Sequence, residues 1–184
     1  MNTEIIRLHD RQFKKFISRE QIQEAIKRLG AQITHDYNGS EVVFVVVLKG
    51  SILFATDLIR EVHLPCTLEF IRAESYGAGM HSSGSVKVAH YTGLDLTGKH
   101  VVVLEDIVDT GLTVKQILLH LQDMKPASLK IATLFLKPEV CQGTVETHYV
   151  GFEISPLFIV GYGLDYNEFG RNLADVFILH ESSV

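Results

Sequence analysis

The chain has 184 residues, and 22 acidic against 17 basic side chains give it a formal net charge of -5. This length suits one domain, and the 46% hydrophobic and 21% charged shares exclude a disordered or fibrous chain. The negative charge argues against nucleic acid as a partner, because phosphate backbones are held by clustered lysine and arginine. No apolar run approaches the roughly 20 residues of a membrane helix, so no membrane partner is expected. Two cysteines are too few for a disulfide scaffold and the N-terminus lacks a signal-peptide pattern, so we expect a cytoplasmic protein.

The first predicted element is a helix that begins at Ser18. Ser18 and Gln21 match a capping box, in which each side chain satisfies a backbone N–H group of the first turn. The apolar positions that follow at helical spacing are Ile22, Ala25, Ile26 and Leu29. Gly30 is predicted to end this helix.

Apolar runs rich in β-branched residues then predict buried strands. The strong runs are Val42–Leu48, Val101–Leu104, Ile131–Leu136 and Leu157–Val160, and the weaker ones are Thr67–Arg72 and Ser85–His90. Helical patterns follow two of the strong runs, over Ile52–Ile59 and Thr113–Leu121. This alternation predicts an α/β fold with a mostly parallel, twisted sheet flanked by helices on both faces. Because such sheets bind ligands outside the carboxyl ends of their strands, the loops after the strong runs are the candidate site.

The most informative stretch follows the strand Val101–Leu104. It places Glu105 and Asp106 at the strand end, then Asp109, then the turn Thr110-Gly111-Leu112-Thr113 that opens a helix. Adjacent carboxylates only accept hydrogen bonds, which suits the neighbouring hydroxyls of a ribose. The backbone N–H groups and hydroxyls of the turn suit a phosphate. The pattern therefore predicts a 5-phosphorylated ribose, although a plainer interpretation is a capped helix beside two solvated acids.

This stretch closely resembles the ribose-phosphate fingerprint of the type I phosphoribosyltransferases. Three further segments narrow the resemblance to the 6-oxopurine branch, the hypoxanthine-guanine phosphoribosyltransferases. They are Leu48-Lys49-Gly50-Ser51, Leu134-Phe135-Leu136-Lys137-Pro138 and the run LFIVGYGLDYNEFGRNL over 157–173. The resemblance extends from about residue 40 to the end of the chain. It implies the type I fold in one domain, residues 1–184, with a core of about 36–149 and a small hood from about 1–35 and 150–184.

The resemblance implies transfer of a 5-phosphoribosyl group from phosphoribosyl pyrophosphate to a 6-oxopurine, which gives IMP or GMP and pyrophosphate in purine salvage. Asp109 fits a general base for the purine N7 proton by its position one turn after the ribose acids. The implied 5-phosphate site is Asp109, Thr110, Gly111, Leu112 and Thr113, and the implied pyrophosphate site is Lys49, Gly50 and Arg171. A cis peptide bond is implied before Lys49. Leu112 stands where mammalian relatives carry lysine, and Ser51 replaces a glycine found in many relatives.

The implied purine site consists of Lys137, Phe158, Ile159 and Asp165. Lys137 would donate to the purine 6-oxygen and so exclude adenine, whose 6-amino group is also a donor. A flexible lid over about 74–86 would close with Ser75 and Tyr76. The implied cofactor is Mg²⁺, with Asp165, Glu105 and Asp106 as its ligands, and the implied assembly is a homodimer or homotetramer.

Two alternatives stay open on the sequence alone. One is a regulator that has kept the fold and binds nucleotides or the sugar pyrophosphate without turnover. The other is the same chemistry on xanthine or a pyrimidine. The sequence does not rank hypoxanthine against guanine, because both present the same 6-oxygen.

Overall fold

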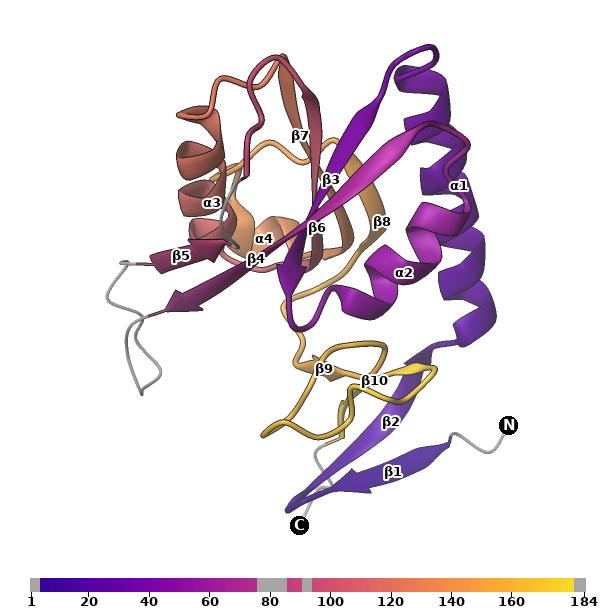
Figure 1. Ribbon diagram of the computed structural model, residues 1–184. Coiled ribbons are helices and arrows are strands. Elements are labelled where there is room, and N and C mark those ends of the chain that lie inside the picture. The colour runs from indigo at the N-terminus through magenta and orange to yellow at the C-terminus, as the bar shows by residue number, and fades with distance from the viewer. Residues whose placement is uncertain (1–3, 76–85, 91–93, 181–184) are drawn as a thin grey trace.

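The computed structural model describes residues 4–75, 86–90 and 94–180, and two sheets lie within them (Figure 1). The strands of the main sheet are β3 (Val42–Leu48), β4 (Cys66–Ser75), β5 (Val86–His90), β6 (His100–Val108), β7 (Ser128–Leu136) and β8 (Tyr149–Glu153). Their order across the sheet is β5-β4-β3-β6-β7-β8. Every neighbouring pair is parallel except β4 and β5, so five parallel strands carry one antiparallel edge strand. The predicted mostly parallel α/β sheet is confirmed.

Helices cover both faces of the main sheet, as predicted. Helices α1 (Arg19–Asp36) and α2 (Ile52–Arg60) pack on one face, and α3 (Leu112–Gln122) packs on the other (Figure 1). The apolar run of β3 is buried almost throughout because helices lie on both sides of it. A short helix, α4 (Pro138–Cys141), follows β7.

The second sheet is antiparallel and lies beside the ends of β3 and α2 in the lower part of Figure 1. Its strands are β1 (Ile5–Leu8), β2 (Arg11–Ile17), β9 (Ile159–Val160) and β10 (Val176–His180), in the order β1-β2-β10-β9. The chain therefore joins an N-terminal and a C-terminal segment in one small layer. Helix α1 and strand β8, which fall largely within the residue ranges expected for the hood, pack with the main sheet instead.

Helix α1 shows where sequence reasoning succeeded and where it was wrong. The capping box is present, with the Ser18 hydroxyl accepting from the Gln21 N–H group and the Gln21 side chain accepting from the Ser18 N–H group. The helix does not end at Gly30 but continues to Asp36. A Cβ atom on Gly30 would lie 2.6 Å from Glu61 Cβ, so the glycine lets α1 approach the end of α2.

Several strand boundaries also differ from the prediction. The expected strand Leu157–Val160 is reduced to β9, whereas β6 extends four residues beyond Leu104 to Val108. Strands β1, β2, β8 and β10 were not predicted. In β2 only Phe13 and Ile17 are buried, because charged and polar residues occupy most of its other positions. Among the described residues, no helix is both long and apolar enough to span a membrane.

Candidate active site

Three segments expected at the site meet near the carboxyl ends of β3 and β6: the loop after β3, the acids of β6 and the loop after β9. A Cβ atom on Gly50 would lie 1.7 Å from Asp106 Oδ2, and one on Gly163 would lie 2.1 Å from the Gly50 carbonyl oxygen. Gly163 also has a φ of +98°, which favours glycine. The loop after β9 therefore approaches the loop after β3 so closely that only glycine fits at position 163, and a side chain at position 50 would displace the Asp106 carboxylate.

The loop after β3 begins with a cis peptide bond between Leu48 and Lys49, as the resemblance implied. Ser51 is fully buried, and its hydroxyl donates to the Val47 carbonyl oxygen. Helix α2 begins at the next residue. The serine thus fastens the start of α2 back onto β3, with Lys49 and Gly50 between them.

Glu105 and Asp106 lie within β6 rather than after its end, which corrects the prediction that the strand stops at Leu104. The pairing of β6 with β3 ends at Leu104, whereas its pairing with β7 continues to Val108. The two acids therefore lie at the edge that opens where β3 leaves the sheet. Asp106 Oδ1 accepts a hydrogen bond of 3.0 Å from the Ile107 N–H group.

Burial disfavours the charged forms of Glu105 and Asp106 in the free protein. Burial raises the pKa of Glu105 well above its ordinary value, and the neighbouring charge of Asp106 adds to that effect. Burial also raises the pKa of Asp106, while Glu105, the Ile107 N–H group and the charge of Arg171 oppose the rise. Glu105 Oε2 is buried without a hydrogen-bond partner in the described part of the chain. Since a buried unpaired oxygen costs free energy, this atom suits a ligand hydroxyl or a cation.

The predicted phosphate turn links β6 to α3. Gly111 precedes the helix with a φ of +77°, and a Cβ atom there would lie 3.2 Å from Cys141 Sγ. The Thr110 hydroxyl accepts from the Leu112 N–H group at 3.4 Å. Thr110 and Leu112 are exposed, so the N–H groups of the first helical turn lie at a surface that an anion can reach.

Lys137 and Asp109 form an ion pair at the end of β7. The distance from Lys137 Nζ to Asp109 Oδ2 is 2.9 Å; Lys137 is buried and the Asp109 side chain is half exposed. The Lys137 N–H group also donates to the Val108 carbonyl oxygen at 3.0 Å, which fixes its backbone against β6. A donor and a carboxylate side by side match the O6 acceptor and the adjacent N7–H donor of a 6-oxopurine with its proton on N7.

The loop after β9 carries a second group of charges. Arg171 Nη2 lies 2.7 Å from Asp165 Oδ1, and Arg171 Nη1 donates to the Gly163 carbonyl oxygen at 2.9 Å. Lys49 Nζ lies 3.1 Å from Glu168 Oε2, and this contact holds the pKa of Glu168 below its usual range. The two cations implied for pyrophosphate therefore both have carboxylate partners.

Phe158 presents an aromatic face beside this loop. Its side chain is 47% exposed, although its ring approaches Tyr166 edge-on with 5.9 Å between centroids. Its carbonyl oxygen accepts from the Leu179 N–H group of β10 at 3.0 Å, and Ile159 is buried in β9. A large apolar ring held by the second sheet yet open to solvent is suited to stacking on a planar base.

Some expectations fall outside these contacts. Ser75 ends β4, whereas Tyr76 and most of the expected lid lie outside the described residues. Within the described part of the chain, no three His, Cys, Asp or Glu side chains form a ready metal site.

Sequence reasoning missed three residues that build the site. Gly163 lies within the resembling segment but was assigned no role, and its positive φ and close approach to Gly50 explain why glycine stands there. Glu168 lies inside the resembling segment but received no role. The Tyr162 hydroxyl donates to Asp57 Oδ2 at 2.6 Å and so ties the loop after β9 to α2, a contact between residues 105 positions apart.

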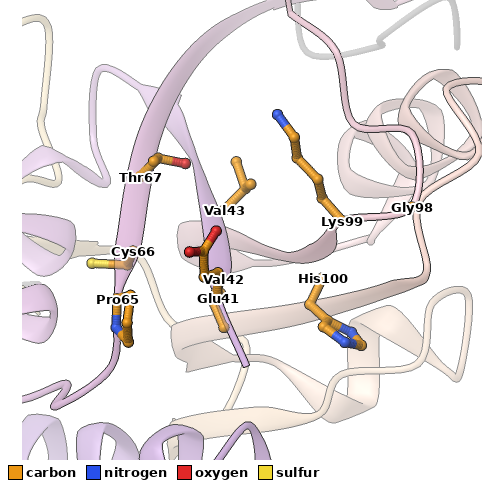
Figure 2. Close-up of a pocket in the computed structure, with 9 residues that line it drawn as sticks. All are labelled: Glu41, Val42, Val43, Pro65, Cys66, Thr67, Gly98, Lys99 and His100. Atoms are coloured by element: carbon orange, nitrogen blue, oxygen red, sulfur yellow. The ribbon is translucent and has the colours of Figure 1, made fainter. Parts of the chain in front are cut away.

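A separate pocket of about 460 Å³ lies at the amino ends of the parallel strands, opposite the site at their carboxyl ends (Figure 2). Its lining residues come from the starts of β3, β4 and β6 and the loops before them: Glu41, Val42, Val43, Pro65, Cys66, Thr67, Gly98, Lys99 and His100. None of the predicted site residues lines it, so the pocket takes no part in the site described above.

Residues 18–167 match the family described as the phosphoribosyl transferase domain, and the chain belongs to that family. A hypoxanthine-guanine phosphoribosyltransferase of Mycobacterium tuberculosis is 42% identical over 164 residues, which cover 86% of this chain and 81% of that protein. One of Streptococcus pneumoniae is 41% identical over 91% of this chain and 93% of its own.

Solved structures agree with these relatives. The crystal structure of a Bacillus anthracis hypoxanthine-guanine phosphoribosyltransferase, with a HEPES molecule in its active site, has a TM-score of 0.86 at 42% identity. It covers 96% of this chain and 100% of its own. A hypoxanthine phosphoribosyltransferase of Staphylococcus aureus has a TM-score of 0.85 at 41% identity, with 90% of each chain covered. Within the family, the chain thus falls among the hypoxanthine-guanine phosphoribosyltransferases.

Proposed function

We propose that the protein transfers 5-phosphoribosyl from phosphoribosyl pyrophosphate to hypoxanthine or guanine, in purine salvage, and releases pyrophosphate. The observation that carries this proposal is the ion pair between the buried Lys137 and the half-exposed Asp109, because it offers one donor and one acceptor side by side. A 6-oxopurine with a proton on N7 presents the complementary acceptor and donor on one edge.

Base selection rests on Lys137. Its ammonium group can only donate, so it suits the 6-oxygen and leaves the 6-amino group of adenine unpaired. Phe158 supplies the face on which the purine stacks, and the Ile159 backbone reads the base edge. Hypoxanthine and guanine share the recognised atoms, so both are expected as substrates.

The sugar and its 5-phosphate are held by groups at the end of β6. Glu105 and Asp106 accept from the ribose hydroxyls, and the backbone N–H groups of the turn 109–113 hold the 5-phosphate. Lys49, Gly50 and Arg171 hold the pyrophosphate through two cations and a backbone N–H group. In this arrangement the anomeric carbon lies between the pyrophosphate and the purine.

The proposed cofactor is Mg²⁺, held by Asp165 with Glu105 and Asp106. The unpartnered Glu105 Oε2 fits a hard cation, whose remaining ligands would include phosphate oxygens and water. When bound, Mg²⁺ would neutralise charge on the leaving pyrophosphate. Asp109 accepts the N7 proton as the bond to the sugar forms, and Lys137 keeps that carboxylate oriented toward the base.

The test is a product assay with Mg²⁺, phosphoribosyl pyrophosphate and one base at a time: hypoxanthine, guanine, xanthine, adenine or uracil. We expect nucleotide from hypoxanthine and guanine, with one pyrophosphate released for each nucleotide. Nucleotide from xanthine or uracil alone would support the same chemistry on another base. Binding of phosphoribosyl pyrophosphate without nucleotide from any base would support a regulator and overturn the proposed activity.

Two further expectations accompany the proposal. A reducing, cytoplasmic setting is expected because both cysteines are free thiols, Cys66 exposed and Cys141 buried. A homodimer or homotetramer is expected from the resemblance, and light scattering on the purified protein would measure its mass.

A further inference from the structure

We propose that the Glu168 carboxylate occupies the place of a substrate phosphate in the free protein and is displaced when pyrophosphate binds. The inference rests on the proposed function, because it concerns the two cations assigned to pyrophosphate. It gives Glu168 a role in setting the affinity of that subsite.

The contacts of Glu168 are those of a bound anion. Its Oε2 atom lies 3.1 Å from Lys49 Nζ and 3.6 Å from Arg171 Nη2, so one oxygen bridges both cations. Lys49 comes from the loop after β3, whereas Glu168 lies 119 residues later in the chain. One oxygen shared by two cations of different segments is also the arrangement expected of a pyrophosphate oxygen.

The side chain is free to leave while its backbone stays in place. The Glu168 N–H group donates to Asp165 Oδ2 at 2.8 Å, and Tyr166 and Phe169 exchange backbone hydrogen bonds around it. The Glu168 side chain is nevertheless 66% exposed. A change of side-chain rotamer therefore suffices to move the carboxylate into solvent, without disturbing the loop.

Arg171 does not depend on Glu168 for its position. It keeps its 2.7 Å contact with Asp165 and its hydrogen bond to the Gly163 carbonyl oxygen. Lys49, by contrast, has Glu168 as its one ion-pair partner in the described part of the chain. Loss of the Glu168 charge should therefore leave Arg171 in place and leave Lys49 available to an incoming anion.

The experiment is calorimetric titration of the free protein with pyrophosphate and Mg²⁺, for wild type and Glu168→Gln. Without the carboxylate, pyrophosphate no longer competes with Glu168 for the two cations, so the variant should bind pyrophosphate about 2–30-fold more tightly. The KM for phosphoribosyl pyrophosphate should fall in parallel. Equal or weaker binding by Glu168→Gln would overturn the inference, because a carboxylate that positions Lys49 and Arg171 would weaken the site when removed.

Two matched variants exclude a general charge effect. Glu41→Gln removes one negative charge at the opposite edge of the sheet and should leave pyrophosphate affinity unchanged. Glu168→Asp keeps the charge but shortens the side chain by one methylene, so it should bind pyrophosphate nearly as tightly as Glu168→Gln. If Glu168→Asp behaved like wild type, charge alone would explain the gain and displacement would be refuted.

The outcomes also separate this inference from the proposed function. Wild-type protein that makes nucleotide, but whose pyrophosphate affinity Glu168→Gln does not raise, would refute the role of Glu168 alone. Wild-type protein that neither makes nucleotide nor binds pyrophosphate would refute the proposed function, and the inference with it.

Discussion

The parallel strands of the main sheet begin at one side of the sheet, here called the amino edge, and end at the other, the carboxyl edge. The two edges hold polar side chains in different ways. At the amino edge the Tyr149 hydroxyl donates to Asp36 Oδ2 at 2.8 Å, and Lys130 Nζ lies 3.1 Å from that hydroxyl oxygen. His100 Nδ1 and Ser128 Oγ are likewise 2.8 Å apart. These groups satisfy one another within the protein, and their arrangement needs nothing from outside.

The carboxyl edge is incomplete by comparison. Glu105 Oε2 and Arg171 Nε are buried without a hydrogen-bond partner among the described residues, and burial raises the pKa values of both Glu105 and Asp106. The unfavourable state of these groups in the free protein indicates where a ligand contributes. The pocket of Figure 2 lies at the amino edge, where the polar groups pair with one another. In this protein, unpaired buried polar atoms therefore indicate the functional site better than the presence of a pocket does.

The largest effect is expected from Asp109→Asn at the carboxyl edge. Asparagine still accepts from Lys137 but takes up no proton, so turnover should fall about 10²–10⁴-fold with substrate affinity nearly unchanged. The measurement is kcat with hypoxanthine at saturating phosphoribosyl pyrophosphate. A variant with wild-type kcat would exclude Asp109 as the base.

A smaller loss is expected from Lys137→Ala. Removing a charged hydrogen bond to the 6-oxygen should raise the KM for hypoxanthine about 10–100-fold and change the KM for phosphoribosyl pyrophosphate far less. Lys130→Ala at the amino edge is the matched control and should leave both KM values near wild type. Equal increases for the two substrates would contradict a base-reading role for Lys137.

Glu105→Gln should stabilise the free protein at neutral and higher pH. Because burial raises the pKa of Glu105, the folded protein retains a proton that the unfolded chain releases above about pH 4.3. Stability contributed by that proton is therefore lost as pH rises through the raised folded pKa. Urea unfolding at pH 8 should show a gain of about 1–3 kcal/mol that shrinks toward pH 4. A less stable variant at pH 8 would show that Glu105 is satisfied in the free protein.

The smallest functional effect is expected from Tyr149→Phe at the amino edge. It removes the hydrogen bond to Asp36, so the free energy of unfolding should fall by about 1 kcal/mol. Both KM values and kcat should stay at wild type, since none of the described site residues is hydrogen-bonded to this group. A loss of activity without a loss of stability would break the distinction between the two edges.

The sequence predicted correctly those elements whose boundaries depend on residues close by in the chain. Strand β3 has the predicted boundaries because it is apolar throughout, and the start of α1 is decided by the capping box at Ser18. The end of α1 could not be predicted, because Gly30 serves a contact with Glu61 that lies far along the chain. Strand β2 was missed because its half-exposed position leaves few apolar residues in its pattern.

The candidate site likewise contains some features that local sequence predicts and others that depend on contacts between distant segments. The acids of β6 and the turn before α3 are contiguous in sequence, so their chemistry could be predicted from the residues alone. Contacts between distant segments could not: the packing of Gly50 on Asp106, the pair of Lys137 with Asp109, and the bridge from Lys49 to Glu168. Each depends on how the second sheet or a neighbouring strand is placed, which no local pattern encodes.

The most direct measurement is a crystal structure with Mg²⁺, phosphoribosyl pyrophosphate and a hypoxanthine analogue that has carbon in place of N9 and so cannot react. The 5-phosphate should lie on the turn 109–113, the pyrophosphate between Lys49 and Arg171, and the base on Phe158 with its 6-oxygen at Lys137. Glu168 should have turned away from Lys49. Ligand bound instead at the amino edge, in the pocket beside His100, would contradict the assignment of function to the carboxyl edge.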